Sequence, residues 1–205
     1  GAEALAKHMP PTLLSLNLEA NFLAAQGARA LGPCLPSTLR TLQLSFNNLR
    51  ADGVAALAQH LPQSLVVLDL GNNEIGPQGV ASLAAHLPSG LQRLDLRGNG
   101  VTAKGVAALG SNKAIFDLKY LNLESNALRE DGAAALGQFL PGLSALTHLD
   151  VGNNRLGVEG GQALAPCLPP GLLHLNASFN FPVARHEEMR ASLKERISDE
   201  ARVLV

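Results

Sequence analysis

Leucines recur along the chain in an alternating pattern that ends on an asparagine. The pattern L-x-x-L-x-L-x-x-N recurs in seven copies, beginning at Leu13, Leu39, Leu65, Leu91, Leu118, Leu146 and Leu172, with Val151 and Ala177 in place of the third leucine in the last two. The steps between successive copies are 26, 26, 26, 27, 28 and 26 residues. Alternation within each copy places apolar side chains on one face and polar side chains on the other, which predicts a short strand. A sustained period of this length indicates a repeat architecture.

A second pattern follows each of the first six asparagines and predicts a helix. A glycine stands six residues after each of them, at Gly27, Gly53, Gly79, Gly105, Gly132 and Gly160. Leucines follow at spacings of four, and in most units a proline comes next, as in Leu57, Leu61 and Pro62. Leucines at i and i+4 bury one stripe of a helix. Proline, which lacks a backbone N–H, then ends that helix.

Each unit is therefore a strand, a turn and a helix, and stacked units bury one continuous core. Parallel strands stack about 4.8 Å apart, whereas packed helices need about 8–10 Å. This mismatch bends the stack, with the strands inside and the helices outside. We predict an α/β solenoid of about seven repeats, with a parallel β-sheet on its concave face and helices on its convex face.

Two stretches carry a family resemblance: LQLSFNNLRADGVAALAQHLP (residues 42–62) and LDLGNNEIGPQGVASLAAHLP (residues 68–88). They resemble leucine-rich repeat proteins of the ribonuclease-inhibitor-like subclass, although the cysteine-rich habit of ribonuclease inhibitors is missing. The resemblance covers roughly residues 1–182 and implies recognition of other proteins through the concave sheet and its bordering loops. Because this family shares a scaffold rather than a chemistry, the resemblance is weak for function.

Both ends of the chain depart from the repeat. Gly1, Leu5, Met9 and Pro10 match the helical half of a unit. Residues 1–182 therefore form a solenoid that starts mid-repeat, which is either part of a longer solenoid or an N-terminal cap. Residues 183–205 carry Met189, Leu193 and Ile197 at i+4 spacing. In the same domain, we expect a helix that caps the last repeat, or alternatively docks a partner, and a candidate eighth strand in ARVLV.

Composition argues against several classes of partner. A net charge of −1 contrasts with the basic footprint of a nucleic-acid binder, and one Tyr, six Phe and no Trp leave few platforms for stacked bases. No apolar run approaches the roughly 18 residues of a membrane span, no signal-peptide pattern opens the chain, and two cysteines suggest no disulfide framework. We expect a cytoplasmic protein that binds no nucleic acid, membrane, small-molecule substrate or cofactor.

Two apparent sites are explained by the repeat. LQRLDLRGNGVTAKGVAALG (residues 91–110) looks like a phosphate-binding loop, but it lacks G-x-x-x-x-G-K-[ST] and its Asn99 and Gly105 occupy repeat positions. Histidines and cysteines recur one residue before the last leucine, at positions 8, 34, 60, 86 and 167. Zinc ligands must lie within about 2.3 Å of one ion, so helices about 8–10 Å apart cannot share such a site. The asparagine itself satisfies backbone groups where the strand turns.

The positions that the repeat leaves free face the concavity and are candidates for binding. They are most varied from the third to the sixth unit, and Tyr and Arg are favoured at the energetic centres of interfaces. The predicted partner-binding residues are Asp69, Arg93, Asp95, Arg97, Tyr120, Glu124, His148 and Asp150. The alternative is that these side chains are only solvated, or that Arg93, Asp95 and Arg97 pair with one another. After subtraction of the repeat, Gly98 and Gly100 also remain as candidates in this stretch.

One unit breaks the pattern. After Leu109 the chain reads GSNKAIFDLKYL, with Lys113 where the last leucine belongs and no proline. We expect the helix to end at residues 110–112 and Ile115 and Phe116 to fill the gap. The irregular segment is either a loop that projects for binding or packing around a one-residue insertion.

The sequence favours a non-enzymatic scaffold that binds another protein and belongs to a larger protein or assembly. It contains no nucleophile elbow and no H-E-x-x-H, so we expect no catalysis. One alternative is a regulator in the manner of Ran GTPase-activating proteins, acting with an arginine or asparagine from the loops at a strand end. Another is a ligand-sensing segment of an innate immune receptor.

Overall fold

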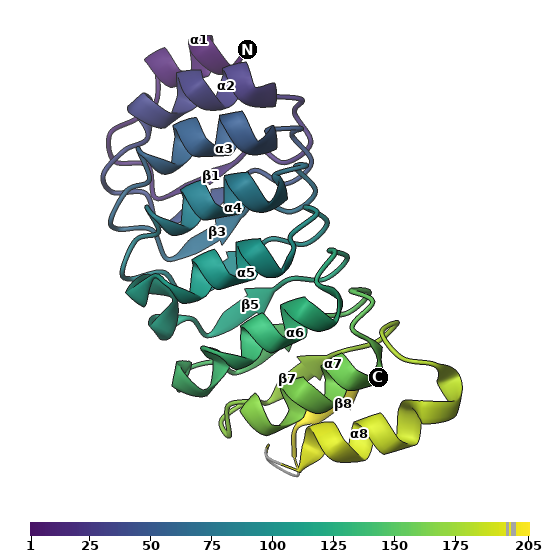
Figure 1. Cartoon of the computed structure of the whole chain (residues 1–205). Coiled ribbons are helices and arrows are strands. Elements are labelled where there is room, and N and C mark those ends of the chain that lie inside the picture. Colours follow the sequence, from purple (N-terminus) through teal and green to yellow (C-terminus); the bar gives the residue numbers. More distant parts are fainter. Residues whose placement is uncertain (196, 198–199) are drawn as a thin grey trace.

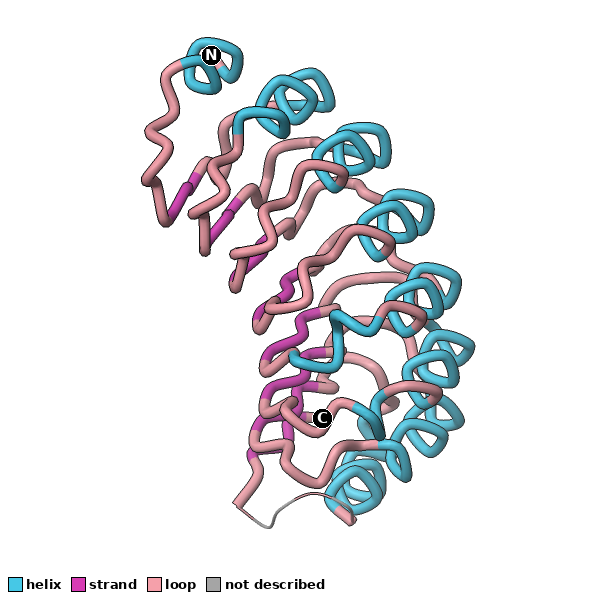
Figure 2. Tube along the Cα trace, turned by 90° about the vertical axis from the view of Figure 1, so that its left-hand side faces the viewer, coloured by secondary structure: helices cyan, strands magenta, loops and turns pink. Residues whose placement is uncertain are grey.

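The computed structural model describes residues 1–195, 197 and 200–205. Within these residues, eight parallel strands form one sheet whose spatial order follows the sequence. Figure 1 shows the helices stacked along one side of this sheet, from the N-terminus at the top to the yellow C-terminal helix at the bottom. The turned view in Figure 2 shows a curved body with strands along the inner side and helices along the outer side. The predicted solenoid is confirmed.

The strands and helices alternate along the chain. The strands are β1 (Ser15–Asn17), β2 (Thr41–Gln43), β3 (Val67–Asp69), β4 (Arg93–Asp95), β5 (Tyr120–Asn122), β6 (His148–Asp150), β7 (His174–Asn176) and β8 (Arg202–Leu204). The helices are α1 (Ala2–Lys7), α2 (Ala24–Leu31), α3 (Arg50–Ala58), α4 (Gly76–Ala84), α5 (Ala103–Gly110), α6 (Arg129–Gly137), α7 (Gly157–Leu164) and α8 (His186–Lys194). None of these described helices is long and apolar enough to span a bilayer.

The leucines of the repeat form one core between the sheet and the helices. The middle residue of each of the first seven strands is buried, and so are the helical leucines such as Leu57 and Leu83. The helices end before the last leucine column, at Ala58 and Ala84, but Leu61 and Leu87 are still buried. The glycine column permits close helix packing, since a Cβ at Gly53 would lie 2.8 Å from the Cα of Ala25 in the neighbouring helix.

The repeat asparagines join neighbouring units through backbone hydrogen bonds. The Nδ2 group of Asn73 donates at 2.9–3.0 Å to three carbonyls, those of Leu44, Leu70 and Gly71. Its Oδ1 atom accepts from two backbone N–H groups of the preceding unit, those of Asn47 and Leu49. The backbone N–H of Asn73 in turn donates to Oδ1 of Asn99 at 2.8 Å. We call this series of bonds through Asn47, Asn73, Asn99, Asn126, Asn154 and Asn180 the asparagine ladder.

The residues on both sides of Asn47, Asn73, Asn99 and Asn154, and the residue before Asn126 and Asn180, take left-handed backbone conformations. Asn72 and Glu74 have φ values of 53° and 55°, and Gly98 and Gly100 occupy the same two places in the next unit, with φ values of 64° and 66°. Such conformations strain most residues but not glycine. The glycines that resemble a phosphate loop therefore belong to the turn of the repeat, and a further role for Gly98 and Gly100 in binding stays a prediction.

The irregular unit keeps its strand in register. α5 ends at Gly110, and a 3₁₀ helix, η2 (Lys113–Asp117), leads to β5. The side chain of Asn112 accepts from the backbone N–H of Ala114 at 2.8 Å and donates to the carbonyl of Ala84. Ile115 is buried as expected, but Phe116 is 37% exposed, so the expectation that it fills the gap is wrong. Ala114 and Ile115 are the buried residues of this segment.

The C-terminal segment packs on the last unit. Met189 and Leu193 on α8 are buried, as is Ile197, so the predicted apolar stripe faces the core. β8 pairs with β7, with Val203 opposite Leu175, which confirms the candidate eighth strand. Figure 1 shows α8 lying alongside α7 at the lower end of the stack.

The asparagine ladder yields a stability prediction. Replacement of Asn73 by Ala leaves the buried N–H groups of Asn47 and Leu49 without a partner and removes one of the two hydrogen bonds to each of three carbonyls. We therefore expect a loss of at least about 2 kcal/mol in the free energy of unfolding. Asn21 is the matched control, because it is exposed and its side chain makes one hydrogen bond, to the carbonyl of Glu19. Asn21→Ala should cost less than about 1 kcal/mol. Urea unfolding followed by circular dichroism measures both, and equal losses would contradict the role of the ladder.

Candidate functional site

The candidate residues lie on the concave side of strands β3 to β6 and on the turns that follow them. The first and third residues of each strand point away from the core because its middle residue points into it. Arg93, Tyr120 and His148 are first residues, and Asp69, Asp95 and Asp150 are third residues. Arg97 and Glu124 follow β4 and β5 by two positions. All eight therefore belong to one face, although not all are accessible.

The first residues of four adjacent strands stack on one another. The register places Arg93 opposite Tyr120, Tyr120 opposite His148, and His148 opposite His174. The guanidinium carbon of Arg93 lies 3.6 Å from the centroid of the Tyr120 ring, a cation–π contact. The ring centroids of Tyr120 and His148 are 6.0 Å apart, and those of His148 and His174 are 4.3 Å apart with 22° between the planes. We call these four residues the stacked row.

His174 is a member of the stacked row that sequence analysis did not choose. The repeat alone placed His174 as the first residue of its strand. However, the stack depends on the register of β7 with β6, whose first residues are separated by 26 positions in the chain. Only the three-dimensional pairing brings the two imidazoles face to face.

Hydrogen bonding determines the tautomer of the neutral His148 ring. The Thr147 hydroxyl donates to the carbonyl of Lys119 at 3.0 Å, so its oxygen accepts from Nδ1 of His148 at 2.9 Å. In the neutral ring the proton is therefore assigned to Nδ1, and Nε2 carries the lone pair. Burial lowers the pKa of His148, and the neighbouring His174 and Arg93 charges lower it further.

The central column of polar residues holds the turns at the strand ends. Oδ1 of Asp69 accepts from the backbone N–H of Gly71 at 2.9 Å. The same type of bond recurs in the next four units. In each, the side-chain Oδ1 atom of the third strand residue accepts from the backbone N–H two residues ahead, at Asp95, Asn122, Asp150 and Asn176. Asp and Asn favour such turns because their short side chains reach the backbone two residues ahead. These side chains therefore have a structural role that their polar character alone did not reveal.

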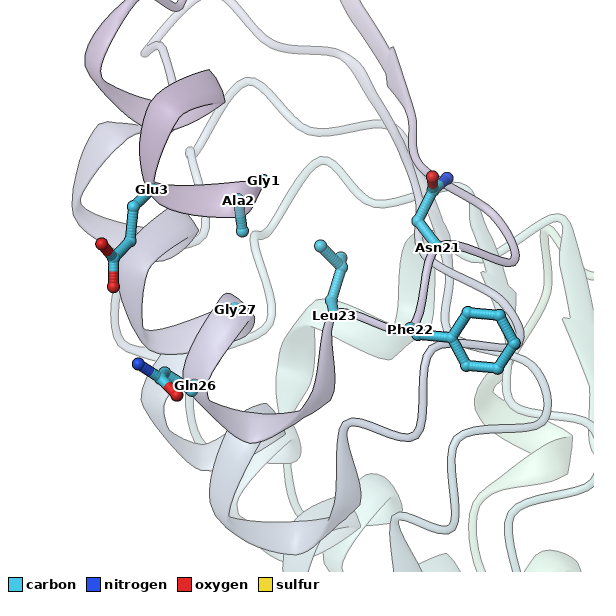
Figure 3. A pocket seen from close by; sticks show the side chains of 8 residues that line it. All are labelled: Gly1, Ala2, Glu3, Asn21, Phe22, Leu23, Gln26 and Gly27. Atoms are coloured by element: carbon cyan, nitrogen blue, oxygen red, sulfur yellow. The ribbon is translucent and has the colours of Figure 1, made fainter.

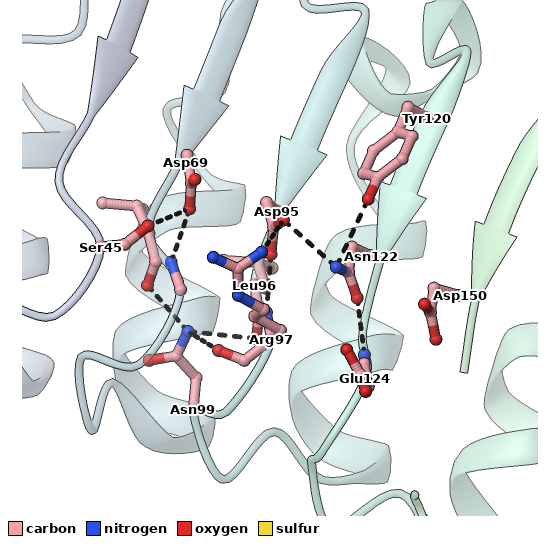
Figure 4. A network of polar contacts seen from close by, with 12 residues as sticks. Ser45, Asp69, Asp95, Leu96, Arg97, Asn99, Tyr120, Asn122, Glu124 and Asp150 are labelled. Carbon is pink, nitrogen blue, oxygen red and sulfur yellow. Dashed lines mark hydrogen bonds and ion pairs between the residues drawn. The ribbon is translucent and has the colours of Figure 1, made fainter. Parts of the chain in front are cut away.

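Asp95 is not available to a partner. Its side chain is fully buried and lies between Arg97, whose Nη1 is 3.2 Å from Oδ2, and Asn122, whose Nδ2 is also 3.2 Å from Oδ2. Burial raises the pKa of Asp95, opposed by the hydrogen bond from the Arg97 backbone, and the negative charge of Asp69 raises it further. Figure 4 shows this network across β3 to β5. The expectation that Asp95 contributes to a binding surface is wrong, because Arg97 folds over it.

Two accessible carboxylates lie beside the stacked row. Glu124 and Asp150 are half-buried. Burial raises the pKa of Glu124, and the negative charge of Asp150 raises it further. Burial also raises the pKa of Tyr120, whose hydroxyl lies 3.5 Å from Nδ2 of Asn122. The concave face thus places cations and rings along the beginnings of the strands and carboxylates along their ends.

A hollow of about 240 Å³ lies at the C-terminal end of the stacked row, lined by His148, His174, Leu175, Asn176, Arg202 and Leu204. A second hollow, of about 320 Å³, lies at the N-terminal end of the solenoid between α1, α2 and the turn after β1. Figure 3 shows that the polar ends of Glu3 and Gln26 point away from Leu23 at this second hollow. The first hollow lies on the stacked row, whereas the second lies away from it.

Three of the five regularly spaced histidines and cysteines contact a carbonyl four residues earlier in their own unit. Nδ1 of His8 lies 2.8 Å from the carbonyl of Ala4, and Nδ1 of His86 lies 2.9 Å from that of Ser82. These contacts place them as polar residues on the helix surface. Among the described residues, no group of three or more His, Cys, Asp or Glu side chains is placed to hold a metal ion.

Sequence comparison finds one repeat family in this chain. The model of the leucine-rich repeat matches residues 36–58, 62–84, 91–110, 116–137 and 143–165, which is more than half of the chain. No curated protein matches it.

Similar structures include three from different organisms. LegL7, a leucine-rich repeat-containing protein of Legionella pneumophila, is 22% identical with a TM-score of 0.58 over 94% of this chain and 75% of its own. The internalin InlF of Listeria monocytogenes is 22% identical, with a TM-score of 0.59. The match covers 100% of this chain and 50% of the internalin chain. A chain in the structure of the yeast Rad7 and Elc1 complex is 18% identical, with a TM-score of 0.64. The match covers 88% of this chain and 44% of that one. The chain thus spans half or less of the latter two, and these likenesses concern the fold alone.

The environment of His148 yields a prediction for its titration. We expect its pKa, measured by NMR, to lie below the ordinary value of 6.5, because burial and two neighbouring cations oppose protonation. The substitutions His174→Asn and Arg93→Gln should each raise it by removing a neighbouring charge. Because the unfolded state binds the proton more readily, His148 should stabilise the fold less as pH falls below about 6.5. Lys104→Gln on the convex face is the control, and a pKa unmoved by the first two substitutions would contradict this account.

Proposed function

Because the chain belongs to the leucine-rich repeat family, we propose that it is a protein-recognition scaffold that binds a partner through its concave face and the bordering loops. The observation that carries this proposal is the stacked row on β4 to β7. Tyr and Arg are enriched at the centres of protein interfaces, and here Arg93 and Tyr120 already contact each other. A side chain that is held before binding loses less conformational entropy on binding.

The central column supports the same proposal by its rigidity. Asp69, Asn122 and Asp150 each bond to a backbone N–H two residues ahead, so the polar surface rests on fixed turns. A preorganised surface of this kind suits recognition. The binding residues we propose are Asp69, Arg93, Arg97, Tyr120, Glu124, His148 and Asp150, with His174 added and Asp95 removed.

The proposed role is non-enzymatic and intracellular, within a larger protein or assembly. The polar groups of the concave face are used to hold turns and to stack on one another, and this arrangement serves binding. The GTPase-activating and immune-receptor alternatives stay predictions, as does the ribonuclease-inhibitor-like subclass.

Photo-crosslinking tests which face binds. A benzophenone amino acid at position 120 should crosslink a partner protein in cells that express the chain, because Tyr120 lies on the concave face. The same group at Lys104, exposed on the convex helix α5, is the matched control and should give no such product. The double variant Arg93→Ala, Tyr120→Ala should bind the identified partner at least about tenfold more weakly. Crosslinking from position 104 alone, or unchanged binding by the folded double variant, would refute the concave-face proposal.

A further inference from the structure

Charge is divided across the concave face in the direction of the strands. Basic side chains gather where the strands begin, at Arg93, Lys119, His148, His174 and Arg202. Acidic side chains lie where the strands end, at Asp69, Glu124 and Asp150. The parallel register aligns Arg93, Tyr120, His148, His174 and Arg202 in one line across β4 to β8, and Lys119 precedes Tyr120 by one residue. A partner on this line therefore meets a guanidinium charge at each end, whereas the lowered pKa of His148 favours its neutral ring between them.

Each ring in this line packs one of its faces against a neighbouring side chain. Arg93 covers a face of Tyr120, and His148 stacks on His174. Their edges remain for a ligand. A guanidinium lying flat on a ring keeps its N–H donors in its own plane, where they can meet a carboxylate. The Arg93 guanidinium therefore presents edge-on hydrogen-bond donors while its face packs on Tyr120.

The cations at the two ends of the line are not neutralised by the rest of the protein. Within the part of the chain that the structure describes, the ion pairs include neither Arg93 nor Arg202. Both residues are exposed, as is Lys119 between them. By contrast, the Arg97 guanidinium is paired with the buried Asp95. The unpaired guanidinium groups at the ends of the line are thus free to bind an anionic group.

The hollow beside β6 to β8 adds a place for one side chain. Its lining combines the two stacked imidazoles and the Arg202 guanidinium with the aliphatic Leu204. A glutamate side chain matches this lining, because its methylene groups can contact Leu204 while its carboxylate reaches Arg202. Nδ2 of Asn176 is already bonded to Asp150 at 3.0 Å, so Arg202 is the principal donor there.

We propose that the partner presents an acidic peptide segment that crosses strands β4 to β8 along their beginnings. One carboxylate binds Arg93, and another enters the hollow against Arg202. This inference rests on the proposed function, and it names the chemistry of the partner. A nucleic acid fits less well, because base stacking needs open ring faces and Arg93 and His174 already cover one face of Tyr120 and of His148.

Selection of peptides on the full chain tests the proposal. Random twelve-residue peptides displayed on phage should yield binders enriched in Asp and Glu. A selected peptide, labelled with fluorescein, should bind about tenfold more weakly to Arg93→Gln and to Arg202→Gln, each of which removes a charge-assisted hydrogen bond. Arg93→Lys should bind better than Arg93→Gln because it keeps the charge. Lys104→Gln on the convex face is the matched control and should bind like the wild type.

Salt and competition measurements separate the acidic peptide from other ligands. Raising NaCl from about 50 mM to about 300 mM should weaken wild-type binding more than binding by either glutamine variant. Peptides without acidic enrichment, or equal binding by wild type and both folded glutamine variants, would overturn the inference. Tighter binding of single-stranded oligouridylate at Arg93 and Arg202 would overturn it in favour of nucleic acid. Crosslinking from position 120 is independent of these outcomes, so a partner of other chemistry would leave the proposed function standing.

Discussion

The structure depends on the way each asparagine satisfies the backbone of two neighbouring units. Where a strand turns towards its helix, carbonyl and N–H groups enter the interior, and each would be costly without a partner. The amide of Asn73 bonds to five of them, three carbonyls and two N–H groups. Because the Asn73 side chain bonds to its own unit and to the preceding one, it fixes both the shape of the turn and the spacing of neighbouring units. Sheet register, helix placement and curvature follow from that spacing.

The chemistry of the concave face is a consequence of this register. Side chains in one column are held about 4.8 Å apart from strand to strand, which is close enough for rings to stack and for an amide to reach a carboxylate. Neighbours in a column therefore interact whether or not a partner is bound. In the first column this produces the stacked row, whose members remain accessible. In the central column it produces a network in which Asp95 is buried beneath Arg97.

The period of the repeat predicted the strands, the helices, the concave face and the eighth strand, because these follow from residue types at regular spacing. It also placed the candidate residues on one face. It did not predict the burial of Asp95, because that depends on how one arginine side chain folds back over the carboxylate. Nor did it predict that Phe116 stays exposed while Ala114 and Ile115 are buried, because that depends on which side of the short 3₁₀ helix faces the core. The role of Gly98 and Gly100 required the backbone angles, which in other units are adopted by Asn and Glu.

The units differ in length, yet β4, β5 and β6 stay in register across steps of 27 and 28 residues. In the 27-residue step, the connection from α5 to β5 departs from the pattern of its neighbours, with η2 and the bonds of Asn112 in place of the usual leucine and proline. The spacing of the strands stays constant while the length and structure of this connection vary. A unit transplanted from another solenoid of this kind would thus need to match its neighbours at the asparagine and the strand. Its outer connection could differ, which makes the inner face a surface that can be recombined one rung at a time.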